Sequence, residues 1–370
     1  MVWFAGLGCR GWFVVRGVRF LLCVMGLQIV WGTSLAAQAP TPQDEPIHTL
    51  HVYTNLIQIP TLVLGPNRER LKAPIAESKF SVSIDSGPWF RATHVRQEGD
   101  DPISLSILLD VSGDEAELMP KIGYAVAALA PLSLHPKDHV SIYVLDCSLV
   151  RTLNDVPAES EELRTGVEKP LESWTTRMQN KHEPSCHQSV HLWDALGFVT
   201  SELYKQPGRR VILAVSEGED KQSTRSWNEV RAHAQATGVA IFGLSYVPQY
   251  AKDVSHAFLR SNREDPFHSL CELSGGMVLL TSTMSLKDVL KQFVTMVRER
   301  YIVEFPRPSN ATSGEHGMEV RVAKSNDFIR AAGITVPIPD AALRADPTTI
   351  RSGPTLTPEM GTRKTMKKPQ

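Results

Sequence analysis

The chain lacks the charge excess and several of the motifs on which large classes of protein depend. Its 39 lysines and arginines nearly balance its 40 aspartates and glutamates, which leaves a formal net charge of -1. Because binding to nucleic acid or to an anionic membrane relies on a strong positive field, the composition supports neither kind of partner. The sequence contains no Gly-x-x-x-x-Gly-Lys-Ser/Thr phosphate loop and no His-Glu-x-x-His zinc motif. These two kinds of enzyme chemistry are therefore not indicated.

Long apolar runs are also missing. The longest candidate, Phe20 to Trp31, is too short to span a bilayer, which needs about 20 apolar residues. Three arginines precede it and small residues follow, which is the order of a secretory signal. We predict a signal peptide over 1–37, cleaved after Ala36 or Ala37, and a Pro-rich linker over 38–47. The alternative is an uncleaved anchor.

This leader has consequences for location and for cysteine chemistry. We expect a secreted, periplasmic or envelope protein with no transmembrane segment in the mature chain. Of five cysteines, the mature chain keeps Cys147, Cys186 and Cys271, an odd number for an oxidising compartment. Cys147 follows one predicted strand and Cys186 precedes a predicted helix at the same sheet edge, so we predict a Cys147–Cys186 disulfide. Cys271 lies in an apolar helix and is expected to be a buried thiol.

Two patterns of hydrophobicity divide the mature chain. Residues 48–98 alternate apolar and polar side chains in short segments without helical period, which predicts a β-rich, sandwich-like domain. From Ile103 to Asp110 the run is almost wholly apolar, as in a strand buried on both faces. Strands and helices then alternate as far as Arg300. The fold class predicted for 103–300 is α/β, a doubly wound, mostly parallel sheet flanked by helices.

The remaining residues indicate a return to the first domain. Short β runs over 301–340, among them Tyr301 to Phe305 and Met318 to Val322, are expected to complete the β-rich domain. From 341 to 370 Pro, Thr, Arg and Lys dominate without any period. Such a composition predicts a disordered tail.

The end of the first buried strand carries the most informative motif. Asp110-Val111-Ser112-Gly113-Asp114 resembles the Asp-x-Ser-x-Ser loop that holds a divalent cation in von Willebrand factor A domains. Trp193-Asp194-Ala195-Leu196 and Ser216-Glu217-Gly218-Glu219-Asp220 resemble two further stretches of that family, in the same order. The flanking strands resemble those of VWFA-related proteins common in acidobacteria. The resemblance covers about 48–339 and implies a VWA/Rossmann-like fold.

The departures from the family pattern lie at the metal site. Asp114 stands where the family has its second serine, Val190 where it has a threonine, and Glu217 where it has a strand-end aspartate. The candidate ligands are therefore Asp110, Ser112, Asp114, Ser189 and Glu217, a degenerate set. Two readings stay open: three converging carboxylates that take Mg²⁺ or Ca²⁺, with at least one pKa raised when no cation is bound, or acids that face water.

The resemblance implies a non-enzymatic binding protein. In the family, an acidic side chain of the partner completes the shell of the cation, which places the ligand at the carboxyl edge of the sheet. We expect an adhesion-like role with an unknown protein or cell-surface ligand. Alternatives are a structural or assembly protein of the envelope, or a serine hydrolase, since Ser216 lies in a loose Gly-x-Ser-x-Gly-like context.

Overall fold

The computed structural model describes residues 56–112, 118–146, 148–179, 191–246, 265–308, 312–332, 335–336, 345 and 353–357. The predicted signal peptide and linker lie outside the described residues. No described helix combines the length and the apolar character needed to cross a membrane.

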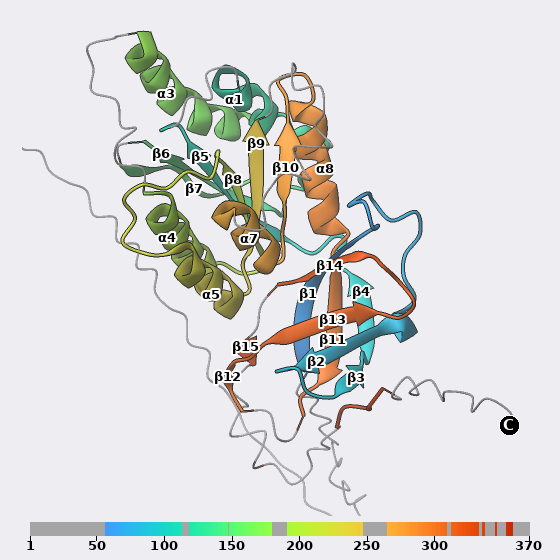
Figure 1. Ribbon diagram of the computed structural model, residues 1–370. Coiled ribbons are helices and arrows are strands. Elements are labelled where there is room, and N and C mark those ends of the chain that lie inside the picture. Colours follow the sequence, from blue (N-terminus) through green and yellow to red (C-terminus); the bar gives the residue numbers. More distant parts are fainter. Residues whose placement is uncertain are drawn as a thin grey trace, which may run out of the picture. The chain divides into compact units, whose positions relative to one another are not determined.

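A six-stranded sheet forms the centre of the α/β part (Figure 1). Its strands are β5 (Ile103–Asp110), β6 (His139–Leu145), β7 (Leu149–Pro157), β8 (Arg209–Val215), β9 (Ala240–Tyr246) and β10 (Val278–Thr281). They lie in the order β10-β9-β8-β5-β6-β7, and only β7 runs antiparallel to its neighbour. The expected doubly wound, mostly parallel sheet is confirmed.

Burial explains why β5 occupies the centre of this sheet. Each of its eight residues is buried, and it pairs with β6 on one side and β8 on the other. A strand covered on both faces can be apolar without alternation, which is the pattern that Ile103 to Asp110 shows. Among the six strands taken in chain order, the first and the fourth are neighbours, so the direction of winding reverses between β5 and β8.

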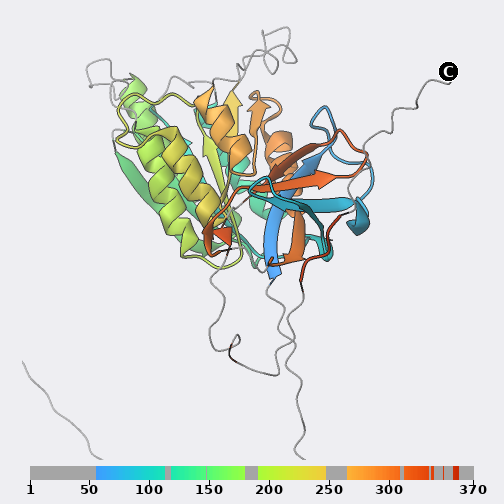
Figure 2. The ribbon, with the colours of Figure 1, turned by 60° about the horizontal axis from the view of Figure 1, so that its bottom comes forward.

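Helices cover both faces of the sheet. The helices are α1 (Met119–Ala127), α2 (Leu129–Leu132), α3 (Ser160–Gln179), α4 (Leu192–Tyr204), α5 (Trp227–Thr237), α7 (Pro266–Leu273) and α8 (Leu286–Arg298). One apolar core includes side chains from α1, α3 and α8, and a second core on the other face includes side chains from α4, α5 and α7. Figures 1 and 2 show α4 and α5 side by side.

Strands from both ends of the chain form the β-rich part. Its strands are β1 (Leu56–Leu64), β2 (Phe80–Ile84), β3 (Trp89–Arg91), β4 (His94–Gln97), β11 (Tyr301–Pro306), β13 (Met318–Val322) and β14 (Phe328–Ala331), with a 3₁₀ turn at Glu77–Lys79 and a two-stranded ribbon of β12 (Gly314–Glu315) and β15 (Thr335–Val336). The main sheet has the order β14-β1-β11-β4, and β13-β2-β3 form a second sheet. Figure 2 shows β1 beside β11.

One stretch of the predicted disordered tail is ordered. Residues 353–357 run along β3, where the amide of Arg91 donates to Thr355 O at 2.8 Å and that of Thr357 donates to Trp89 O at 2.7 Å. Leu356 forms an isolated antiparallel bridge with Phe90. β3 is the last strand of its sheet, so its outer main-chain groups can pair with residues 353–357. Composition alone does not reveal this pairing. These residues therefore lie along β3, and the disorder of the tail as a whole stays a prediction.

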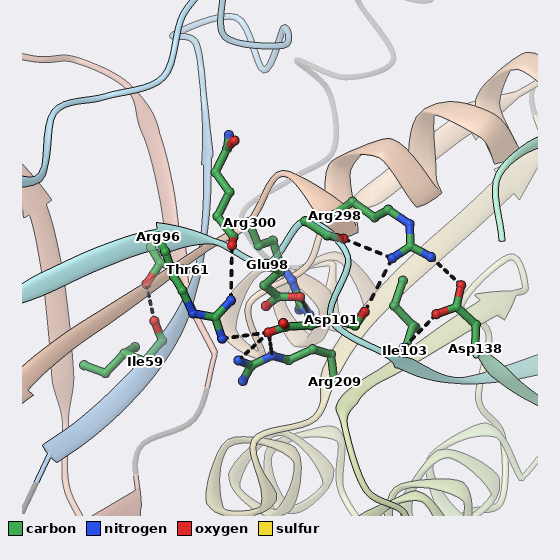
Figure 3. A network of polar contacts seen from close by, with 12 residues as sticks. Ile59, Thr61, Arg96, Glu98, Asp101, Ile103, Asp138, Arg209, Arg298 and Arg300 are labelled. Carbon is green, nitrogen blue, oxygen red and sulfur yellow. Dashed lines mark hydrogen bonds and ion pairs between the residues drawn. The ribbon is translucent and has the colours of Figure 1, made fainter. Parts of the chain in front are cut away.

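Buried ion pairs lie at the amino ends of the central strands, where the chain passes between the two parts (Figure 3). Arg298, at the end of α8, pairs with Asp138, whose other oxygen accepts from the Ile103 amide at 2.9 Å. Arg300 pairs with Glu98 at 3.0 Å, and each side chain is only 2% exposed. Because an unpaired buried charge is costly, these pairs hold the start of β5 in place. The opposite ends of the strands carry the candidate site.

Candidate functional site

Asp110 lies at the carboxyl end of β5, next to the point where the winding of the sheet reverses. It is the last residue of the strand and is 7% exposed. Its Oδ1 accepts the Ser112 amide at 3.1 Å and the Ser112 hydroxyl at 2.5 Å. In open α/β sheets this reversal opens a crevice at the carboxyl ends of the strands. The side chain predicted from the motif is therefore at the position where such folds bind ligands.

Ser216 ties the end of β8 to the end of β5. Its hydroxyl donates to Asp110 Oδ2 at 2.7 Å and accepts the Gly218 amide at 3.0 Å. Gly218 has a φ of 82°, and a Cβ there would come within 2.6 Å of Phe267 in α7. The left-handed backbone and the close helix both require glycine. The Ser-Glu-Gly segment thus turns sharply and presents its serine hydroxyl to Asp110.

The Asp110 carboxyl is held in an environment that disfavours its charge. Burial raises its pKa, and the negative charge of Asp146 raises it further, whereas the hydrogen bonds from Ser112 and Ser216 lower it without offsetting the burial. The sequence analysis expected a raised pKa from mutual repulsion of Asp110, Asp114 and Glu217, and that convergence stays a prediction. Burial is the main cause, and the described acidic neighbour is Asp146, which the sequence analysis did not include in the site.

The rest of the predicted ligand set is only partly described. Glu217 is exposed and directly follows Ser216, whose hydroxyl donates to Asp110. Asp114, Ser189 and Val190 lie outside the described residues. Among the described residues no three His, Cys, Asp or Glu side chains form a group that could hold a metal ion. In the described part of the chain Asp110 Oδ1 accepts two protein hydrogen bonds and Oδ2 accepts one. The five-oxygen set stays a prediction.

Two of the motif stretches have a clear structural role. The Asp194 carboxylate, in the first turn of α4, accepts the amides of Thr224 and Arg225 at 2.8 and 3.0 Å. Burial alone would raise the pKa of Asp194, but these hydrogen bonds outweigh it and lower the pKa. Asp220 in turn accepts the Trp193 amide at 3.2 Å. The loop after β8 is therefore bonded to the start of α4.

Of the three cysteines in the predicted mature chain, the structure describes only Cys271. Cys147 and Cys186 lie outside the described residues, so the predicted disulfide stays a prediction. Cys271 is fully buried in α7, as expected, and burial raises the pKa of its thiol. A buried thiol of raised pKa packs as a small apolar side chain and carries no chemistry.

Sequence reasoning missed Asp146 and the bond between Ser216 and Asp110. A signal for Asp146 was present, because it directly follows the strand His139–Leu145 and parallel strands end at one edge of a sheet. Ser216 follows β8 in the same way. A search for polar residues directly after each buried parallel strand would have identified both Asp146 and Ser216.

Comparisons with known proteins give matches by structure only. No family model matches the chain, and no curated protein matches it in sequence. Proximal thread matrix protein 1 from the mussel byssus matches with a TM-score of 0.39 and 13% identity, covering 54% of this chain and 49% of that one. This chain thus matches about half the length of the byssus protein.

Two bacterial structures also match. An aerotolerance-related membrane protein from Bacteroides fragilis NCTC 9343 has a TM-score of 0.36 and 13% identity, over 52% of this chain and 98% of that chain. BatB from Bacteroides thetaiotaomicron, a conserved hypothetical protein, has a TM-score of 0.34 and 15% identity, over 52% and 99%. The fold described above stands on its strand order and not on these similarities.

Proposed function

We propose that this protein is a non-enzymatic, extracytoplasmic binding protein that holds a protein or cell-surface ligand at the carboxyl ends of β5 and β8. The observation that carries the proposal is the position of Asp110 at the reversal of winding, bonded to the end of β8 through Ser216 at 2.7 Å. In open α/β sheets the ligand-binding crevice forms where the direction of winding reverses, at the carboxyl ends of the strands.

The contacts of Asp110 favour binding that does not depend on a cation. In the VWFA-type site that the motif resembles, a cation bridges the domain and an acidic group of the partner. Here both carboxyl oxygens accept hydrogen bonds from Ser112 and Ser216, which link two strand ends within the protein. We propose that the edge is preorganised by these bonds, and that the degenerate set binds Mg²⁺ or Ca²⁺ weakly or not at all.

Calorimetry tests the cation directly. Titration of the full chain with Mg²⁺, Mn²⁺ and Ca²⁺ is expected to give no heat of specific binding at millimolar concentrations. Heat that disappears in Asp110→Ala would show that a cation is bound and would overturn the cation-independent form of the proposal. Ser112→Ala serves as a second variant, because it removes one neutral oxygen and leaves the charge of the site unchanged.

The location and the lack of catalysis are parts of the same proposal. The leader sequence supports export of an envelope-associated protein, adhesion-like in role and of the VWFA-related acidobacterial type. The Ser216 hydroxyl is buried and donates to a carboxylate, not to a histidine. We expect Ser216→Ala to leave any ester turnover of a preparation unchanged. A loss of turnover in that variant alone would support a hydrolase.

A further inference from the structure

The outer edge of β3 is covered by a short segment from much later in the chain. β3 is the last strand of its sheet, and residues 353–357 lie antiparallel to it, with Leu356 opposite Phe90. The amides of Arg91 and Thr357 each donate across this edge, at 2.8 and 2.7 Å. Two main-chain hydrogen bonds that flank one residue pair are the pattern of a regular antiparallel ladder. The segment is therefore held as an added strand.

The sequence of the segment matches the length of the edge that it covers. β3 has three residues, Trp89–Arg91. In the segment, Pro354 and Pro358 bound three residues, Thr355–Thr357. Because proline has no amide hydrogen to donate, the two prolines limit the length of the paired stretch. Threonine is β-branched and favours the extended backbone of a strand, so length and composition both suit this segment to one short strand.

Side chains contribute little to the hold on this segment. Leu356 is 59% exposed, Thr355 is exposed, and the Thr357 hydroxyl donates to that of Ser81 over a long 3.4 Å. Phe90, by contrast, is 8% exposed and belongs to the apolar core of the β-rich part. Parts of a fold with few buried apolar contacts open first. The segment is therefore expected to leave the edge while β3 stays in its sheet.

The position of the segment in the chain sets how readily another segment replaces it. Residues 337–352 connect it to the end of β15 at Val336. The effective concentration of a segment tethered in this way is on the order of millimolar. A second segment of the same sequence must reach about that concentration to compete, unless the contacts of the chain's own segment are weakened first.

We propose that residues 353–357 are a displaceable strand, and that the outer edge of β3 accepts the same segment of a second copy of the chain when its own has left. The argument for this occupant is that its sequence is the one that the structure shows on the edge. Strand addition draws its affinity from main-chain hydrogen bonds, which the segment forms equally well from another molecule. The inference is independent of the proposed function, because β3 lies outside the sheet that carries Asp110.

Hydrogen exchange of two neighbouring amides in the full chain tests the displacement. The Arg91 amide donates to the segment, whereas the Phe90 amide faces β2, because hydrogen-bonding groups alternate between the two sides of a strand. Each release of the segment exposes only Arg91, so its amide should exchange about tenfold or more faster than that of Phe90, after correction for intrinsic rates. Equal rates would show that the segment leaves only when the sheet unfolds, and would overturn the proposal.

Two proline variants connect this exchange to the added strand. Thr357→Pro removes the amide that donates to Trp89 O, so exchange at Arg91 should become about three- to tenfold faster while Phe90 is unchanged. Leu356→Pro is the matched control, because in this residue pair the Leu356 amide points away from β3. Exchange at Arg91 should stay at the wild-type rate in the control. Equal effects of the two prolines, or no effect of Thr357→Pro, would contradict the proposal.

A peptide copy of the segment tests acceptance from a second molecule. Arg-Ser-Gly-Pro-Thr-Leu-Thr-Pro, the sequence of residues 351–358, is added to the full-length Thr357→Pro chain at about 10 mM, above the effective concentration of the tethered segment. It should slow exchange of the Arg91 amide back to the wild-type rate or below. The same peptide with Pro in place of its second Thr should not, because it lacks the donor to Trp89. No slowing by either peptide, or equal slowing by both, would overturn the proposal.

Discussion

At the scale of single residues, Asp110 connects the sequence to the site. Its position at the end of an almost wholly apolar run predicted a strand-end carboxylate, and the structure places it there with 7% exposure. The sequence did not reveal that the hydroxyls of Ser216 and Ser112 donate hydrogen bonds to its carboxyl oxygens. These contacts depend on the pairing of β5 with β8, which brings together residues about a hundred positions apart in the chain.

A pair of substitutions at Asp110 separates its charge from its hydrogen bonds. Asp110→Asn keeps an oxygen for Ser112 and offers an amide to Ser216, so we expect no loss of stability at pH 7. Asp110→Ala leaves those donors unpaired in a buried place and should lower the free energy of unfolding by about 1–3 kcal/mol. Urea unfolding at pH 7 measures both.

The same substitution carries a pH dependence with a defined sign. A carboxyl whose folded pKa is raised contributes stability that is fully present below its ordinary pKa and is lost as the pH rises through the folded pKa. Urea unfolding over the acidic range should therefore show Asp110→Asn gaining on the wild-type chain as the pH rises. A difference that shrinks with rising pH would show that the carboxylate is stabilised in the fold.

At the scale of elements, periodicity predicted most strands and helices of the α/β part, but not every boundary. The helical spacing of apolar residues from Glu115 to Leu134 predicts one helix, whereas the described residues there form two, α1 ending at Ala127 and α2 spanning Leu129–Leu132. The amphipathic pattern of Glu159 to Ser173 predicts a helix over that stretch, and the observed helix α3 continues to Gln179, past the internal Pro170. Boundaries of this kind depend on the packing of α1 against α3, which local sequence does not encode.

The turn after β8 gives a prediction about how elements are held together. Gly218→Ala should reduce stability by about 1–2 kcal/mol for its left-handed backbone and by about 1–3 kcal/mol more for the overlap with Phe267. Gly238→Ala is the control, because Gly238 has a similar φ of 65° but no atom within 4 Å of the added Cβ. Equal losses in thermal or urea unfolding would show that α7 does not constrain this turn.

At the scale of the whole molecule, paired charges lie where the chain passes between the β-rich part and the α/β part. Arg300→Met should lower the free energy of unfolding by about 3–5 kcal/mol, because it leaves Glu98 buried and unpaired. Adding Glu98→Leu should recover most of that loss, since two apolar groups can replace a buried pair. Urea unfolding of the single and double variants decides the point, and a double variant as unstable as the single one would contradict it.

Site-specific photo-crosslinking tests the central claim, that the carboxyl edge of β5 and β8 is the binding surface. A photoreactive p-benzoylphenylalanine replaces Glu217, exposed beside Ser216, and in a matched protein it replaces Glu319, exposed on β13. Each full chain is irradiated with envelope extract, with and without a chelator. The account predicts a discrete adduct at Glu217, unaffected by the chelator, and none at Glu319. Identical adducts at both positions, or none at Glu217, would contradict it.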